Sequence, residues 1–461
     1  MSNLYEAVRD KQRLRSQQLG CRGLSQRLDA LSLLKQMLID HQDRWLDALH
    51  FDLGKPAVEA YSSELAVLLN EIDRTSRHLR KWLKPTVKRR LLLGSIDHVE
   101  VSAHPYGSVL VLSPWNYPLQ LALMPVIGAL AGGNGVVLKP SEYAQTTSAL
   151  LAELVPRYFS EDTLYVAEGG QSVAESLTAL EWDFVFFTGS TETGRKVYQA
   201  AAAHLTPVLL ELGGKNPCIL DVGATNKVTV REIAWGKFLN AGQSCIAPDT
   251  VYVPRKDYKT FLHLMKERLL AFYGDAPLDS DDYGRIIHQQ HFDRLIAYLD
   301  QGECYVGGHY RENQLKIAPT IMVDLKEDSP ITNEEIFGPL LAVVAYDKLD
   351  DLLKDLRKQA VPLCVYAFSK DNKWLSHIEE SLESGAFSVN HLMLHAVNPH
   401  LPFGGKGQSG MGNYHGYASF KAFTYQRSRY RKRTAIKLSQ QFPPYSTFAL
   451  NAIKHFRKRI F

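Results

Sequence analysis

The sequence predicts an α/β protein with two parallel-sheet domains and a small β element that bridges them. From His98 onward, short runs rich in β-branched residues alternate with helical segments. The same alternation starts again near residue 222, and glycine-rich turns directly follow several of the strand-like runs. Strands and helices in alternation imply right-handed crossovers and a mostly parallel sheet, whose binding sites lie at the carboxyl ends of the strands.

The chain is long enough for two or three domains, each with its own core. It has 461 residues, of which 45% are hydrophobic and 22% are charged. No run approaches the roughly 18 apolar residues that would span a bilayer, and the N-terminus lacks the continuous apolar stretch of a signal peptide. We therefore expect a cytoplasmic protein.

The first 84 residues have the periodicity of helices. Apolar residues recur at three-and-four spacing up to Gly54, a residue type that often ends a helix, and a second periodic stretch ends at Pro85. Residues 86–103 then resemble a hairpin arm, and a late strand near residue 425 could pair with it. Exposed strand pairs usually find a partner, so these elements, 86–103 and 397–435, predict oligomerisation.

The last 26 residues, 436–461, form a basic tail. No Asp or Glu follows Glu383. A helix in this tail would place a basic row beside an apolar face, which favours contact with a membrane surface. A solvated face, or a cap over a site in a partner subunit, would explain the same pattern. The tail has no aromatic stacking platform, so we expect no nucleic-acid binding. The apolar face consists of Phe448, Ala449, Leu450, Ile453, Phe456 and Ile460.

The first chemical motif is LSPWNYPLQ, which contains Asn116. Proline on either side fixes this turn, and the Asn116 amide could donate a hydrogen bond to an oxyanion. The competing interpretation is a turn residue that caps the helix beginning at Leu119.

Two further turns follow strand-like runs and suit a nucleotide. Lys139 and Glu142 could hold ribose hydroxyls, although they are equally an ordinary exposed pair. Gly189, Ser190 and Gly194 lie at a strand-to-helix turn whose free N–H groups suit a phosphate. The turn is neither a Walker A loop nor a full G-x-G-x-x-G fingerprint, so a plain turn stays possible here.

Two carboxylate motifs complete the set of candidates. Glu211 ends an apolar strand, where burial would raise its pKa towards that of a useful base, unless it forms a salt bridge with Lys215. Further on, Glu335 and Phe337 precede a Gly-Pro turn; of Glu335 and its neighbour Glu334, one could serve the site while the other faces water.

The stretch NAGQSCIAP contains Cys245 among small and polar residues. The five cysteines are scattered without a C-x-x-C pair, so we expect neither a disulfide framework nor a metal site. A single cysteine is usually an inert piece of core. The combination of motifs changes this expectation. Oxidation of an aldehyde through a thioester requires a thiol for covalent attack, an amide for the oxyanion and a carboxylate to activate water.

The sequence resembles the aldehyde dehydrogenases and, within that family, the class 3 branch that acts on fatty and aromatic aldehydes. The resemblance is carried by seven motifs in order: PWNYP, LKPSE, FTGSTETG, ELGGKNP, GQSC, EEIFGP and PFGGKGQSGMG. The resemblance covers essentially the whole chain. It implies that Cys245 is the nucleophile, that Asn116 and the Cys245 N–H form the oxyanion hole, and that Glu211 is the general base. It also implies that Lys139 and Glu142 contact the adenosine ribose, that Gly189 and Gly194 border the pyrophosphate, and that Glu335 and Phe337 hold the nicotinamide ribose and ring.

The same resemblance implies the domain plan, the assembly and the substrate class. Residues 1–85 and 104–210 would form a Rossmann-like dinucleotide-binding domain, and 211–396 a Rossmann-like catalytic domain. Members of this length are typically dimers. Glu142 would accept a 2′-hydroxyl and repel a 2′-phosphate, so NAD is favoured and NADP stays possible. The implied tunnel residues suit medium or long aliphatic, or aromatic, aldehydes: Tyr61, Tyr117, Leu121, Trp235, Leu239, Met393 and Phe403.

Two other functional classes fit parts of the sequence. The first is an acyl-transfer enzyme, either coenzyme A-dependent or a plain thiol esterase, that uses Cys245 without net oxidation. The coenzyme A branch of the same fold usually lacks the carboxylate at Glu211, so hydrolysis is favoured. The second is a non-catalytic scaffold, against which stand Cys245, Glu211 and Asn116 together.

Overall fold

The N-terminal region is helical, as the sequence predicts. The computed structural model describes residues 2–21, 23–87, 98–327, 329–431 and 442–460. Helix α3 ends at Gly54, which adopts the left-handed conformation with φ 65° that glycine favours. The elements of this region are α1 (Ser2–Leu19), α2 (Leu24–Asp40), α3 (Gln42–Leu53), α4 (Ala57–Ala60), the π-helical turn η1 (Tyr61–Leu65) and α5 (Ala66–Trp82).

The first of the two large sheets has six strands in the order β17-β7-β6-β3-β4-β5. All neighbours are parallel except β17, which pairs antiparallel with β7. Strands β3 and β4 are buried throughout. The elements are β3 (Ser108–Leu112), α6 (Gln120–Gly132), β4 (Gly135–Lys139), α7 (Gln145–Tyr158), β5 (Leu164–Val166), α8 (Gln171–Thr178), β6 (Phe184–Gly189), α9 (Thr191–Ala202), β7 (Val208–Leu212) and β17 (Gly410–Met411).

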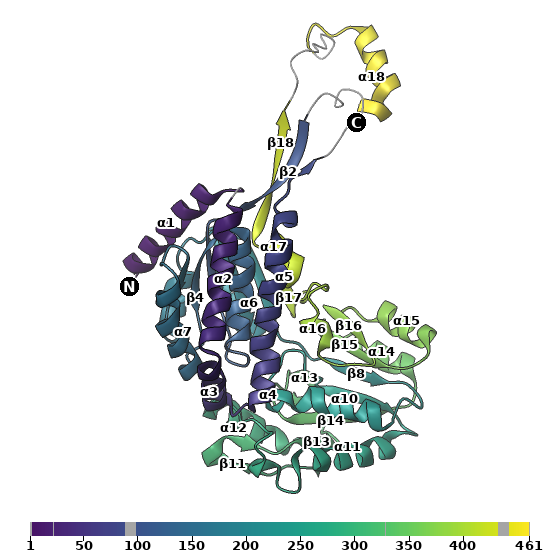
Figure 1. Ribbon diagram of the computed structural model, residues 1–461. Coiled ribbons are helices and arrows are strands. Elements are labelled where there is room, and N and C mark those ends of the chain that lie inside the picture. Colours follow the sequence, from purple (N-terminus) through teal and green to yellow (C-terminus); the bar gives the residue numbers. More distant parts are fainter. Residues whose placement is uncertain (1, 22, 88–97, 328, 432–441, 461) are drawn as a thin grey trace.

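The second large sheet has seven strands in the order β10-β13-β14-β9-β8-β15-β16, with only the edge strand β10 antiparallel. These two sheets confirm the predicted α/β class (Figure 1). The strands are β8 (Pro217–Leu220), β9 (Thr250–Pro254), β10 (Glu303–Val306), β13 (Thr320–Val323), β14 (Leu340–Tyr346), β15 (Cys364–Phe368) and β16 (Ala386–Val389). The helices are α10 (Lys227–Phe238), α11 (Tyr258–Tyr273), α12 (Gln289–Leu299), α13 (Pro330–Asn333), α14 (Leu349–Leu356), α15 (Asn372–Ser381) and α16 (Leu394–Val397). Short 3-10 turns and a small hairpin complete this part: η2 (Leu239–Gly242), η3 (Pro277–Asp279), η4 (Glu312–Gln314), β11 (Tyr310–Arg311) and β12 (Lys316–Ile317).

A third sheet forms an arm that projects from the body (Figure 1). It contains β1 (Thr86–Val87), β2 (His98–Pro105) and β18 (Thr424–Arg431), and β18 follows α17 (Gly416–Ala422). Strand β18 pairs antiparallel with β2 over its full length, so the late strand joins the arm as predicted. The predicted turn of the arm falls within residues 88–97, outside the described residues.

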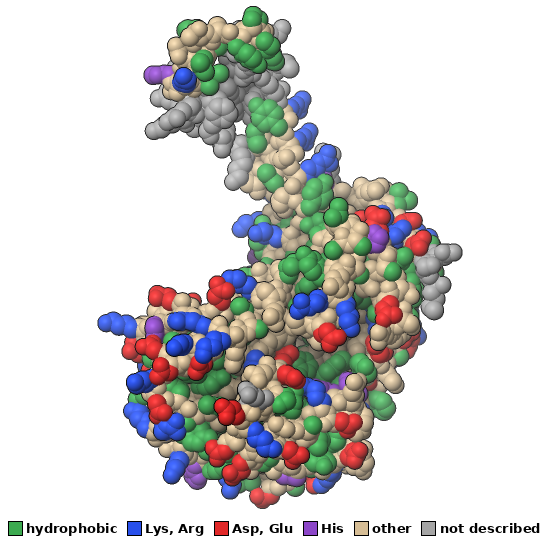
Figure 2. Space-filling model, turned by 180° about the vertical axis from the view of Figure 1, so that it is seen from behind, with side chains coloured by type: hydrophobic (Ala, Val, Ile, Leu, Met, Phe, Trp, Pro, Cys, Tyr) green, Lys and Arg blue, Asp and Glu red, His purple; other side chains and the backbone are tan. Residues whose placement is uncertain are grey.

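Helix α18 (Thr447–Ile460) lies at the far end of this arm. Figure 2 shows hydrophobic side chains gathered there and basic side chains along the arm. Phe448, Leu450 and Ile453 are exposed, whereas Ala449 is buried, so Ala449 does not belong to the outward face predicted from the sequence. The side chains of Phe456 and Ile460 lie outside the described part. Among the described residues, no helix has the length and apolar character needed to cross a bilayer.

Candidate active site

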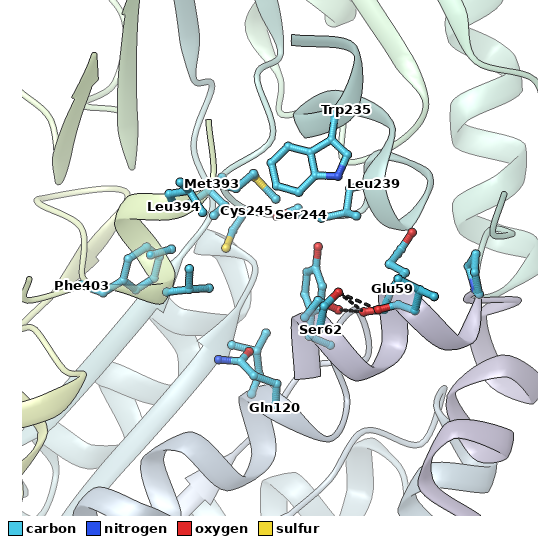
Figure 3. Close-up of a pocket in the computed structure, with 18 of the residues that line it drawn as sticks. Glu59, Ser62, Gln120, Trp235, Leu239, Ser244, Cys245, Met393, Leu394 and Phe403 are labelled. Carbon is cyan, nitrogen blue, oxygen red and sulfur yellow. Dashed lines mark hydrogen bonds between the residues drawn. The ribbon is translucent and has the colours of Figure 1, made fainter. Parts of the chain in front are cut away.

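An apolar cavity of about 530 Å³ opens next to Cys245 (Figure 3). Six of the seven predicted tunnel residues line it, namely Tyr117, Leu121, Trp235, Leu239, Met393 and Phe403. The structure does not bring Tyr61 to this lining: its side chain is 40% exposed on η1. Other residues of the same helical region, Glu59, Ser62 and Ser63, contribute to the wall instead.

The loop that carries Cys245 is held in an unusual backbone conformation. Asn240 and Ala241 have positive φ angles of 53° and 51°, a strained arrangement that is common at functional sites. Gly242 follows with φ 74°, and a Cβ there would lie 2.2 Å from the Gly338 carbonyl oxygen. Only glycine therefore fits at this position, where the Cys245 loop meets the turn after Phe337.

Asn216 fixes the loop from the other side. Its Nδ2 donates to the carbonyl oxygens of Cys245 at 2.7 Å and Ala247 at 3.1 Å, and its Oδ1 accepts from the Cys364 N–H at 2.9 Å. Asn216 is not one of the residues predicted from the sequence, although it lies in the ELGGKNP motif, because nothing local reveals contacts with residues so far along the chain.

The Cys245 side chain is partly buried beside two carboxyl groups. Burial raises its pKa, the charges of Glu211 and Glu335 raise it further, and the backbone N–H groups of Cys245 and Ile246 oppose the shift. The thiol form is therefore favoured at rest, and the thiolate needs additional positive charge or a base in order to form.

Glu211 is the next-to-last residue of β7 and is almost completely buried. It is 1% exposed, and neither of its carboxyl oxygens has a hydrogen-bond partner among the described residues. Burial raises its pKa well above the ordinary value. The alternative salt bridge is wrong, because Lys215 Nζ donates instead to the carbonyl oxygens of Ile331 at 2.7 Å and Glu334 at 3.0 Å. Glu211 is thus a buried carboxyl group with free oxygens.

Asn116 is also buried, and its amide donates to the Gln243 carbonyl oxygen at 3.1 Å in the loop that precedes Cys245. The turn that carries Asn116 therefore contacts the cysteine loop directly. The capping alternative is wrong, because Glu64 Oε2, not Asn116, accepts the N–H groups of Leu119 and Gln120.

The nucleotide candidates lie at the carboxyl ends of β4 and β6. Lys139 and Glu142 form an ion pair. Ser190 caps α9, where its Oγ accepts from the Thr193 N–H at 3.3 Å. A Cβ at Gly194 would lie 2.5 Å from Leu212 Cδ2, so α9 packs closely on β7, and Gly189 ends β6 directly before it. An α-helix that begins beside a strand end in this way presents N–H groups to an anion.

Glu335 approaches the end of β7 from the second sheet. A Cβ at Gly213 would lie 1.9 Å from Glu335 Oε2, so this glycine permits the approach. Burial raises the pKa of Glu335 to about 8, and its Oε1 is buried without a hydrogen-bond partner among the residues that the structure describes. Its neighbour Glu334 is exposed and accepts from the Tyr298 hydroxyl at 2.8 Å. Of the two acids, Glu335 therefore points into the site.

Phe337 lies next in the same turn. It has φ 53°, and its ring meets Trp115 edge to face at 5.3 Å. His291 Nε2 lies 2.8 Å from the Phe337 carbonyl oxygen, and Arg294 donates to the Glu335 carbonyl oxygen at 3.1 Å. The turn is thereby fastened to α12.

The site combines a helix N-terminus at a strand end with a thiol at an apolar cavity beside a buried carboxyl group. On two mostly parallel sheets, these features indicate a nucleotide-binding α/β enzyme. Comparisons with known proteins agree. Residues 5–428 match the family model described as Aldehyde dehydrogenase family, and the chain belongs to this family. It is an NAD(P)-dependent enzyme that oxidises aldehydes.

The similar proteins cover nearly the whole chain. 4,4'-Diapolycopene-4,4'-dial dehydrogenase of Cytobacillus firmus is 46% identical over 426 residues, which is 92% of this chain and 94% of that protein. Aldehyde dehydrogenase family 3 member B1 of Rattus norvegicus is 40% identical over 422 residues, 91% and 90% of the two chains. The substrate-bound structure of Staphylococcus aureus AldH is 36% identical, has a TM-score of 0.95, and covers 98% of this chain and 99% of its own.

Proposed function

We propose that this enzyme oxidises medium- or long-chain aliphatic, or aromatic, aldehydes to carboxylic acids through a thioester on Cys245. The observation that carries this proposal is the position of Cys245 at an apolar cavity of about 530 Å³ whose wall includes Trp235, Leu239 and Phe403. Such a wall suits an extended apolar or aromatic substrate, because binding removes apolar surface from water.

In the proposed reaction, the Cys245 thiolate attacks the aldehyde carbon and the carbonyl oxygen becomes an oxyanion. The Asn116 amide and the Cys245 N–H donate hydrogen bonds to this oxygen, and charge that develops there is stabilised by donors already in place. The former aldehyde carbon then loses a hydride, for which a nicotinamide cofactor held by this chain would supply the acceptor. The acyl group then stays on the sulfur as a thioester.

Glu211 completes the cycle in this proposal. As a carboxylate it takes a proton from water, and the water oxygen attacks the thioester carbon. The bond between this carbon and the Cys245 sulfur then breaks, which releases the carboxylic acid as product and restores the thiolate. Within the described part of the chain, both carboxyl oxygens of Glu211 lack hydrogen-bond partners, so they are available to a water molecule.

The residues present fit a dinucleotide. We infer that residues 1–85 and 104–210 hold it and that 211–396 supply Cys245. The buried, unpartnered Oε1 of Glu335 suits a ribose hydroxyl, and the start of α9 at Ser190 suits the pyrophosphate. Phe337, fixed against Trp115, would lie against the nicotinamide.

The Glu142 carboxylate is proposed to favour NAD over NADP, because it accepts a 2′-hydroxyl and repels a 2′-phosphate. Substituting Glu142→Gln is expected to lower the ratio of kcat/KM for NAD to that for NADP by about tenfold, roughly one lost charge-assisted interaction. Steady-state kinetics with both cofactors measure this ratio. An unchanged ratio would show that a group other than Glu142 discriminates between NAD and NADP.

The first test of the proposed reaction is the absorbance of reduced nicotinamide when the purified protein meets hexanal, a long-chain aldehyde and benzaldehyde, each with NAD and with NADP. Product analysis completes it: the free acid supports hydrolysis, and acyl-coenzyme A formed only with added coenzyme A supports acyl transfer. Hydrolysis of an ester without nicotinamide reduction would favour a thiol esterase. No turnover with any pair of aldehyde and cofactor would favour a non-catalytic scaffold.

We propose that two copies assemble through the arm. Among the described residues, strand β18 lies at the edge of the arm's sheet, and its residues beyond Thr424 are exposed, so this edge is accessible to a second chain. The mass of the particle in solution, measured by light scattering, checks this.

We further propose that the enzyme is cytoplasmic and binds anionic membrane surfaces through α18. Phe448, Leu450 and Ile453 are exposed on a helix that also carries Lys454, and no acidic residue follows Glu383. We expect removal of residues 447–461 to lower the bound fraction on anionic vesicles about tenfold or more, with little binding of either protein to neutral vesicles. Equal sedimentation of the full-length and shortened proteins with anionic vesicles would contradict this, and would favour the helix as a cap on the partner subunit.

A further inference from the structure

A buried ion pair lies beneath the turn that carries Asn116. Lys55 and Glu64 are both 0% exposed and contact each other through Lys55 Nζ and Glu64 Oε1. Neither takes part in the proposed chemistry. Removing two charges from water carries a large desolvation penalty, and a buried pair alone is weak evidence for stability. The groups that the two charged side chains hold in place indicate the role of the pair.

Glu64 fixes the far end of the turn. Its Oε2 accepts the N–H groups of Leu119 at 2.9 Å and Gln120 at 3.0 Å, so a carboxylate from another helix caps the N-terminus of α6. Glu64 lies within the π-helical turn η1. Such turns inside helices are frequent at functional sites, because the extra residue changes where a side chain points.

Lys55 fixes the near end. Its Nζ donates to the Asn116 carbonyl oxygen at 3.0 Å and lies 4.0 Å from the centre of the Tyr117 ring. The same carbonyl oxygen accepts Asn240 Nδ2 at 2.7 Å, from the strained loop before Cys245. The backbone of Asn116 is therefore tied to the ion pair on one side and to the cysteine loop on the other.

We infer that Lys55 and Glu64 are positioning residues, which hold the Asn116 amide in register with Cys245 so that it can receive the oxyanion. The inference rests on the oxyanion role proposed above. An oxyanion donor is effective only when it is fixed before the reaction, and displacements of about half an ångström already weaken such a site. The ion pair spans both ends of the short turn, which no other pair of charged side chains among the described residues does.

The test is a double-mutant cycle. Glu64→Gln is expected to lower kcat about tenfold, with the aldehyde KM and the cofactor affinity changed less than about twofold; Asn116→Ala is expected to lower kcat about 10²-fold. In the Asn116→Ala background, Glu64→Gln should lower kcat no further, because a positioning residue has no effect once the group it positions is gone. Lys55→Met should behave like Glu64→Gln.

A matched control separates positioning from general loss of stability. Arg27 is as buried, at 1% exposure, and donates to the Ala131 carbonyl oxygen at 2.8 Å, near the opposite end of α6. Arg27→Met should lower the melting temperature yet leave kcat unchanged. If Glu64→Gln does not fold, the variant Lys55→Met with Glu64→Gln, which leaves no lone buried charge, replaces it in the cycle.

Three results would overturn the inference. If the folded Glu64→Gln variant keeps the wild-type kcat while Asn116→Ala is slow, the positioning role of the ion pair is wrong, and the oxyanion role of Asn116 stands. If Glu64→Gln lowers kcat by the same factor in the wild type and in the Asn116→Ala variant, the ion pair acts independently of Asn116. A full rate in Asn116→Ala rejects the oxyanion role and, with it, this inference. Cofactor binding, measured by fluorescence, confirms in each variant that the fold is intact.

Discussion

Cys245→Ser is expected to lower kcat/KM for every aldehyde by about 10³-fold or more, because a serine hydroxyl ionises far less readily than a thiol and forms no thioester. The substitution removes little volume, and it leaves the contacts that hold the loop in place, because Asn116 and Asn216 donate to the backbone carbonyl oxygens of Gln243 and Cys245. The rate of nicotinamide reduction measures the loss, and fluorescence titration should show that cofactor still binds.

The matched control is Cys304→Ser. Cys304 is also partly buried and free, but it lies in β10 beside Met322 and outside the cavity. It should retain nearly full activity, so that a loss in Cys245→Ser alone identifies the catalytic thiol. Substantial aldehyde oxidation by Cys245→Ser, with the same products, would contradict the proposed covalent route.

The sequence was sufficient for the fold class and for most of the candidate site because both depend on local patterns. Cys245, Glu211 and Asn116 each stand in a short motif after a strand or in a tight turn. The carboxyl ends of parallel strands meet at one edge of a sheet, so such motifs converge in space. The structure places Asn116 against the cysteine loop, and Glu211 among the charges acting on Cys245, which agrees with this reasoning.

The remaining features depend on contacts between distant segments. Lys55 and Glu64 precede the Asn116 turn by more than 50 residues and stand in a helical region that has the periodicity of a plain bundle. Strand β17 is only two residues long, so it has no alternation to detect, yet it brings Gly410 opposite Glu211. Tyr61 does not line the cavity, and it begins the π-helical turn η1, a local change of helix geometry that the sequence pattern does not reveal.

Glu211→Gln is expected to separate the two halves of the reaction. Hydride transfer should still occur once, giving a burst of about one reduced nicotinamide per active site, and turnover should then slow about 10²- to 10⁴-fold because the thioester lacks a base to activate water. Stopped-flow absorbance measures the burst. Mass spectrometry of the quenched protein should find the acyl group on the peptide that contains Cys245.

Glu71→Gln is the control for this variant. Glu71 is another buried carboxyl group with a raised pKa. It accepts the Gly416 N–H at 2.7 Å and is not one of the residues that line the cavity. It should show normal steady-state turnover. Steady-state turnover near the wild-type rate in Glu211→Gln would show that another group activates the water.

The raised pKa of Glu211 also sets how the reaction depends on pH. Only the carboxylate accepts a proton from water, so wild-type turnover should climb as Glu211 ionises, at a pH above that at which an ordinary carboxyl group ionises. Glu211→Gln should lose this rise in the slow phase, while the burst keeps the rise due to Cys245 ionisation. Because folded Glu211 holds a proton that the unfolded chain has released, stability falls as pH increases between the ordinary and raised pKa values. The melting temperature of Glu211→Gln should therefore exceed that of the wild type by a margin that grows as the pH rises through this range, so the carboxylate that makes hydrolysis possible also destabilises the fold.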